Sequence, residues 1–145
     1  MSTGIIIEVE DGKSEIGGYY QNLAEEFNDF SAFLKEDGCD LVPYLYCPES
    51  YQSEEELREW FEDDEEASEE MIKEAIAWNE SVNTRSYAPI REVYGSLLKA
   101  REIAANYGEE RFHHGREGLL ADLDELLGEL EQKKEEDLRM LFFRD

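Results

Sequence analysis

The sequence has few positive charges for its length. Only 14 lysines and arginines stand against 38 aspartates and glutamates, which gives the 145 residues a formal net charge of −24. A surface that binds nucleic acid needs clustered cations opposite the phosphates, and anionic membranes attract the same kind of cluster. We therefore expect no direct nucleic-acid binding and no membrane binding, and we expect any macromolecular partner to be a basic protein.

Cysteine and long apolar runs are also scarce. Cys39 and Cys47 are the only cysteines, and they form no CxxC pair, so neither a zinc site nor a thioredoxin-type motif is indicated. The apolar run Ile5–Ile7 is too short for a signal peptide, and nothing approaches the roughly 18 apolar residues of a membrane span. These absences predict a cytoplasmic protein without a disulfide.

Recognisable catalytic motifs are missing as well. The sequence has no GxSxG, Walker A or GxGxxG pattern, and the segment after Asp11 and Gly12 lacks the alternating ligands of an EF-hand. With 38 acids, carboxylate pairs occur at almost any spacing, so a pair by itself indicates no acid–base site. We expect no cofactor and favour a protein that is not an enzyme.

The two histidines give the one metal hypothesis. On a helix, Glu109 would share a face with His113, and Glu110 would share a face with His114. Mixed imidazole and carboxylate ligands suit zinc or iron. However, adjacent histidines point about 100° apart on a helix, and no third ligand follows at HExxH spacing. An exposed polar loop is therefore the interpretation that we favour.

Apolar periodicity predicts a mainly α-helical bundle in a single domain over residues 1–145. A hydrophobic content of 41% and an aromatic content of 12% separate the chain from disordered sequences. Apolar residues recur at steps of three and four, as in amphipathic helices that bury one face. About five helices are expected, near residues 19–37, 53–61, 68–79, 89–107 and 119–130.

Capping residues mark several of the expected helix ends. Ser53 with Glu56 three residues later forms a capping-box pattern, and Ser68 precedes a first turn that holds two acids. Gly38 is the expected stop of the first helix, and Pro89 suits the first position of a later one. The last two helices are joined by a short linker and should form an antiparallel hairpin.

One or two short β-strands are expected near the N-terminus, at Ile5–Val9 and Leu41–Tyr46. The first is a β-branched run that ends at a turn. The second contains Pro43, which cannot donate to a strand ladder, so it is an edge strand or an extended loop. The last apolar run, Leu138–Phe143, either continues the final helix or forms a strand beside Ile5–Val9, and we expect a helical ending.

The stretch from Glu54 to Glu70 concentrates the charge. It holds eleven carboxylates in 17 residues, and Arg58 is its only cation. A continuous helix of this length would measure about 25 Å, with one carboxylate per roughly 2.3 Å. Duplex DNA carries one phosphate per about 1.7 Å of its axis, so the stretch is compatible with a nucleic-acid mimic that faces a basic protein.

Aromatic residues lie beside this acidic stretch. Aromatic anchors inside a charged rim are common in tight protein interfaces. The candidates are Tyr44, Tyr46, Tyr51, Trp60 and Phe61. The interpretation that we favour is that Trp60 and Phe61 join Leu57 in the core, and that the next helix buries Ile72, Ala75 and Ile76.

Together these features favour a small acidic protein-binding module, such as an inhibitor or immunity-type protein, that captures a basic partner through carboxylates. The expected partner-binding residues are Glu59, Glu62, Asp63, Asp64, Glu65, Glu66 and Tyr51. One alternative is an acidic cytoplasmic domain whose charge reflects adaptation of all the host's proteins. The other is a metal-dependent enzyme centred on His113 and His114.

Overall fold

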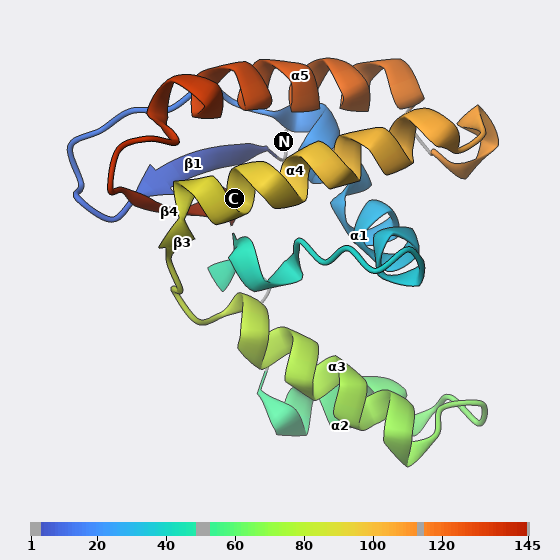
Figure 1. Cartoon of the computed structure of the whole chain (residues 1–145). Coiled ribbons are helices and arrows are strands. Elements are labelled where there is room, and N and C mark those ends of the chain that lie inside the picture. The colour runs from blue at the N-terminus through green and yellow to red at the C-terminus, as the bar shows by residue number, and fades with distance from the viewer. Residues whose placement is uncertain (1–3, 49–52, 113–114, 145) are drawn as a thin grey trace.

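A computed structural model of the chain describes residues 4–48, 53–112 and 115–144. These residues form five α-helices and a four-stranded mixed sheet, so the mainly α-helical prediction is confirmed but the chain is not a pure bundle (Figure 1). The helices are α1 (Gln21–Glu36), α2 (Glu54–Glu62), α3 (Glu69–Val82), α4 (Ile90–Asn106) and α5 (Arg116–Lys133). The strands and short 3-10 helices are β1 (Ile5–Val9), η1 (Val42–Tyr44), β2 (Leu45–Tyr46), β3 (Ala88–Pro89), η3 (Glu109–Arg111) and β4 (Arg139–Arg144).

The sheet is built around the last strand, β4. Its antiparallel pairing with β1 joins Ile5 to Arg144 and Val9 to Met140. On its other edge, β4 pairs parallel with β2 and antiparallel with β3. The N-terminal and C-terminal strands therefore lie side by side in one sheet (Figure 1).

The expected helical ending at Leu138–Phe143 is wrong, because residues 139–144 form β4. Met140, Leu141 and Phe142 are all fully buried, so both faces of this strand are covered. Such a strand is a continuous apolar run without alternation, and a run of this kind does not distinguish a helix from a strand. Pairing with β4 also satisfies the backbone groups of β1, which a helical ending could not do.

The second expected strand is confirmed in part. Pro43 lies in η1, and only Leu45 and Tyr46 pair with β4. Tyr44 contributes its ring to the core, where it meets the edge of Phe142 at 6.1 Å between ring centroids. A proline therefore shortens this strand to two residues at the edge of the sheet.

Helices α4 and α5 form the expected antiparallel hairpin and lie side by side (Figure 1). Helix α1 packs against α5, and its position is fixed at its first turn, where the backbone N–H of Leu23 donates to Asp122 of α5 at 3.0 Å. The residue before α1 is Tyr20, which makes no side-chain cap. A carboxylate from another helix therefore accepts one of the free N–H groups at this helix start.

Helices α2 and α3 form a second hairpin at the opposite end of the molecule from α5 (Figure 1). Ser53 and Ser68 cap these helices as predicted, because each hydroxyl accepts a backbone N–H of the first turn at 3.2 Å. Where α3 ends, the Cys47 N–H donates to the Val82 carbonyl at 2.6 Å. The C-terminal end of α3 is thus attached to the sheet.

Candidate functional site

The α2–α3 hairpin carries an exposed cluster of carboxylates. All eleven acids between Glu54 and Glu70 are exposed. Six of them surround the end of α2 and the turn that follows, and we call this set the acidic turn: Glu59, Glu62, Asp63, Asp64, Glu65 and Glu66. Within the described parts of the chain, no lysine or arginine forms an ion pair with any of the six. These are the predicted partner-binding acids; Tyr51, predicted with them, lies outside the described residues.

Arg58, the only cation of the acidic stretch, binds acids outside the acidic turn. Its two terminal nitrogens donate to the two carboxylate oxygens of Glu69 at 3.3 and 3.1 Å, and its Nε donates to Glu54 at 3.2 Å. The hydrogen bonds from Arg58 lower the pKa of the Glu69 carboxyl and raise the pKa of the guanidinium. This bridge joins α2 to α3 and leaves the charge of the acidic turn uncompensated.

The acidic turn lies where the backbone of α2 disfavours negative charge. The unpaired carbonyls at a helix C-terminus carry partial negative charge, so acids stabilise a helix start and destabilise a helix end. Helix α2 ends at Glu62, is followed by Asp63, and has no basic residue in its last turn. By contrast, Glu69 and Glu70 lie favourably in the first turn of α3. Asp64 has a structural role, because its Oδ1 accepts the Glu66 N–H at 3.0 Å, but hairpin stability does not account for the other acids of the turn.

The acidic stretch is a hairpin and not one continuous helix. The chain turns after α2, where the Asp64 N–H donates to the Phe61 carbonyl at 3.1 Å and the Ala67 N–H donates to the Asp64 carbonyl at 3.2 Å. The carboxylates thus surround a turn, and the single row about 25 Å long that a helix would give does not form. The comparison with the linear phosphate spacing of DNA does not apply to this geometry.

Trp60 is exposed, and the expectation that it lies in the core is wrong. It is 73% exposed, and its indole meets the ring of Phe61 edge to face at 5.0 Å between centroids. Leu57 is the buried residue of α2, and Phe61 is half-buried. Periodicity correctly places these three residues on one face of the helix, but it does not reveal how much of that face another layer covers.

Helix α3 is also covered less than expected. Ile72, Ala75 and Ile76 are half-buried, whereas the fully buried residues of this helix are Asn79 and Val82 near its C-terminal end. The hairpin therefore contacts the rest of the molecule mainly at that end. Its remaining apolar side chains are available to line surface hollows.

Tyr44 and Tyr46, two of the other candidate interface aromatics, have structural roles. Tyr44 is buried, and its hydroxyl hydrogen-bonds with Ser96 Oγ at 2.9 Å. Tyr46 is half-buried, and the Arg85 guanidinium stacks over its ring at 4.9 Å. Among the candidates that the structure describes, only Trp60 presents most of its surface to solvent.

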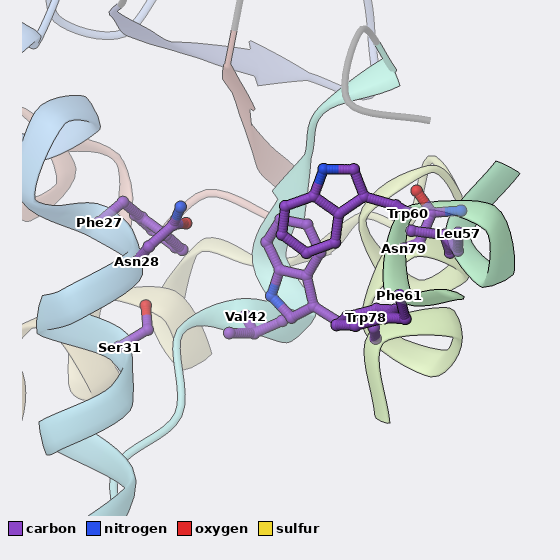
Figure 2. Close-up of a pocket in the computed structure, with 10 residues that line it drawn as sticks. Phe27, Asn28, Ser31, Val42, Leu57, Trp60, Phe61, Trp78 and Asn79 are labelled. Atoms are coloured by element: carbon purple, nitrogen blue, oxygen red, sulfur yellow. The ribbon is translucent and has the colours of Figure 1, made fainter. Parts of the chain in front are cut away.

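A cavity of about 580 Å³ separates the hairpin from α1 (Figure 2). It is open to solvent, and its walls come from α1, η1, α2 and α3. The lining residues are Phe27, Asn28, Ser31, Val42, Leu57, Trp60, Phe61, Ala75, Trp78 and Asn79. The residues of α1 face those of the hairpin across the space (Figure 2). None of these side chains is charged.

Ser31 is the unusual member of this lining. It is only 4% exposed, and its hydroxyl has no hydrogen-bond partner in the part of the chain that the structure describes. A serine inside a helix commonly bonds to a carbonyl one turn earlier, and an unsatisfied buried hydroxyl costs about 1–3 kcal/mol. Ser31 falls on the apolar face of α1, four residues after Phe27, and this polar interruption is the signal by which the sequence could have indicated the cavity.

The described residues provide no group of ligands that would support the metal hypothesis. Glu109 and Glu110 are exposed in η3, remote in sequence from the hairpin, and His113 and His114 lie outside the described residues. Among the residues whose placement is described, no three histidine, cysteine, aspartate or glutamate side chains are grouped so as to hold a metal ion.

Comparisons with protein-family models, with curated proteins and with solved structures gave no match. The hairpin and its surroundings therefore provide the evidence for function. In the described ranges, no helix is long and apolar enough to cross a membrane.

Proposed function

We propose that this chain is a protein-binding module that captures a basic partner through the acidic turn, as an inhibitor or an immunity-type protein does. The observation that carries the proposal is the set of six exposed carboxylates, which form no ion pair with a described cation and lie partly at a helix end that disfavours them. A cationic surface would supply the missing compensation. Complementary charge of this kind steers association and selects the partner.

The distribution of the charge favours a local role over adaptation of the whole surface. Eleven of the 38 acids fall within residues 54–70, a stretch of 17 residues with one cation. A protein adapted as a whole to its medium has no need to concentrate acids at one turn. Elsewhere on the chain, acids pair with cations across helices, as Asp124 of α5 does with Arg101 of α4 at 2.9 Å.

The exposed Trp60 strengthens the case for a protein partner. It follows Glu59 in α2, so the same hairpin presents an exposed aromatic side chain and the acidic turn. Tryptophan is enriched among the residues that dominate binding energy in interfaces. A surface used only to keep the protein soluble would not require an exposed indole.

Affinity capture from the lysate of the native host tests this proposal. The immobilised chain is compared with a turn-neutral variant, in which Glu62, Glu65 and Glu66 become Gln and Asp63 and Asp64 become Asn. We expect the native chain to retain a basic protein at low salt, and to release it in about 1 M salt, where the Debye length is about 3 Å. The turn-neutral variant should fail to retain the same protein.

A matched control separates local charge from net charge. A scattered variant replaces five exposed acids on other segments by Gln: Glu10, Glu15, Glu102, Glu117 and Glu125. Both variants have the same net charge. If the scattered variant loses the basic protein as completely as the turn-neutral variant does, the acidic turn has no special role and the proposal is wrong.

A further inference from the structure

The cavity beside the acidic turn has the size and the lining of a binding site. Binding pockets of about 300–1,000 Å³ with mainly apolar walls and a few polar groups are typical of ligand sites. This cavity has a volume of about 580 Å³ and is bordered by the two tryptophans, Trp60 and Trp78 (Figure 2). Its polar lining groups are neutral: Asn28, Ser31 and Asn79.

Two lining residues are incompletely satisfied by the described parts of the chain. The indole of Trp60 is mostly exposed, although it forms one wall of the cavity. The buried hydroxyl of Ser31 has no hydrogen-bond partner there, although buried hydroxyls nearly always have one. An occupant that covers the indole would correct the first of these deficits, whereas Ser31 Oγ has almost no surface that an occupant could reach.

The charges around the cavity indicate the chemistry of that occupant. Phe61 lines the cavity and also a second hollow, whose other walls include Arg58 and the carboxylates of Glu54, Glu55, Glu59 and Glu62. Arg58 pairs with Glu54, and none of the other three carboxylates forms an ion pair with a described cation. On the α1 side, Arg144 donates to Asn28 Oδ1 at 3.2 Å, so a cation already lies close to that rim. The cavity itself therefore favours an apolar group, while its outer margin on α2 favours cations.

We propose that the cavity receives one bulky apolar side chain of the basic partner. Lysines or arginines on either side of that side chain contact the carboxylates of α2 and of the acidic turn. This inference rests on the proposed function, because it assigns to the same partner the side chain that anchors it.

Three short synthetic peptides test the proposal against the full chain. The first has a phenylalanine flanked on both sides by lysines, and the second has serine in place of that phenylalanine. The third keeps the phenylalanine and replaces every lysine by glutamate. Dissociation constants come from NMR titrations, in which the indole N–H signals of Trp60 and Trp78 report on the cavity and the backbone signals of Glu62–Glu66 report on the acidic turn.

The phenylalanine–lysine peptide should bind about tenfold or more tightly than the serine–lysine peptide, because burial of one large apolar side chain is worth at least that ratio. It should shift both indole signals, whereas the serine–lysine peptide should shift mainly the acidic turn. The phenylalanine–glutamate peptide should not bind.

The failures of the two proposals are distinguishable. If neither lysine peptide binds, the proposed function fails, and this inference fails with it. If both lysine peptides bind equally and the indole signals do not move, the acidic surface is retained and the anchoring cavity is refuted. If the phenylalanine–glutamate peptide binds as well as its lysine counterpart, the basic character of the occupant is refuted.

Variants of α3 and α2 test whether the cavity causes the tighter binding of the phenylalanine–lysine peptide. Ala75→Phe fills the cavity and should abolish the preference for phenylalanine over serine. Ala77→Phe is the matched control, because Ala77 is exposed on the same helix and does not line the cavity. Trp60→Ala removes a wall at an exposed position and should also weaken the preference. If circular dichroism shows that Ala75→Phe is unfolded, the test depends on Trp60→Ala. If Trp60→Ala prefers the phenylalanine–lysine peptide over the serine–lysine peptide as strongly as the native chain does, the proposal is overturned.

Discussion

Arg58 on α2 and Glu69 on α3 form a two-point contact. The guanidinium Nη1 donates to Glu69 Oε2 at 3.3 Å, and Nη2 donates to Glu69 Oε1 at 3.1 Å. This contact closes the hairpin that presents the acidic turn. Arg58 is the only cation between Glu54 and Glu70, and this contact engages it. The carboxylates of the acidic turn therefore need cations from another molecule to balance their charge.

Arg58→Lys should loosen the hairpin without unfolding the protein. Lysine keeps the charge but cannot make the two parallel hydrogen bonds to Glu69. Hydrogen exchange should become faster for the amides of α2 and the start of α3, and it should be unchanged in α4 and α5. Arg101→Lys is the matched control, because Arg101 makes the same kind of paired contact with Asp124 at 2.9 and 3.3 Å between α4 and α5. Unaltered exchange in the hairpin of Arg58→Lys would show that the contact does not hold it.

The turn-neutral variant should be more stable than the native chain at low salt. Neutralisation removes mutual repulsion among the acids of the turn and an unfavourable interaction with the end of α2. Thermal unfolding should show a Tm a few degrees higher at low salt, and the difference should shrink as added salt screens the charges. The Tm of the scattered variant at low salt should rise by less than that of the turn-neutral variant. A lower Tm for the turn-neutral variant would mean that these acids stabilise the hairpin after all.

Substitutions of two large aromatic residues should have very different effects. Phe142 is fully buried in β4 and meets the rings of Phe27 and Tyr44 at 6.5 and 6.1 Å, so Phe142→Ala should lower the free energy of unfolding by about 3–5 kcal/mol. Trp60→Ala should change it by less than about 0.5 kcal/mol, because the indole is exposed. Urea denaturation measures both. A large loss for Trp60→Ala would place the indole among the residues that stabilise the fold.

Asp11 should titrate at unusually low pH. Its carboxylate accepts the backbone N–H groups of Ser14 and Lys13, each at 2.9 Å, and these bonds lower its pKa from 3.8 to about 2. A carboxyl with a lowered folded pKa stabilises the fold above its unfolded pKa and loses this effect as the pH falls through about 2. Asp11→Asn should therefore lower Tm more at neutral pH than near pH 2. An NMR midpoint at or above 3.8 would contradict the lowered pKa.

The sequence predicts the helices well because their signals are local. Ser53 and Ser68 cap α2 and α3 as expected. Gly38 follows α1 with a positive φ of 77°, as a helix stop requires. Capping residues act on N–H and carbonyl groups within one turn, so they indicate a helix end whatever the rest of the chain does.

The sheet and the cavity are harder to predict because they depend on contacts distant in sequence. The apolar run of β4 has no period, and its strand form is determined by pairing with β1, which lies at the other end of the chain. Trp60 fits a helical apolar face, yet it is exposed because none of the described elements covers that part of the hairpin. Ser31 interrupts the apolar face of α1, but the cavity walls opposite it come from α2 and α3, which are distant in sequence.

The role of the acidic turn in binding a basic partner is tested most directly by the dissociation constant of the phenylalanine–lysine peptide. This constant is compared for three proteins: the native chain, the turn-neutral variant and the scattered variant. Measured by titration at low salt, it should rise about tenfold or more in the turn-neutral variant and change little in the scattered variant. Equal dissociation constants for the native chain and the turn-neutral variant would contradict the claim that the acidic turn binds a basic partner.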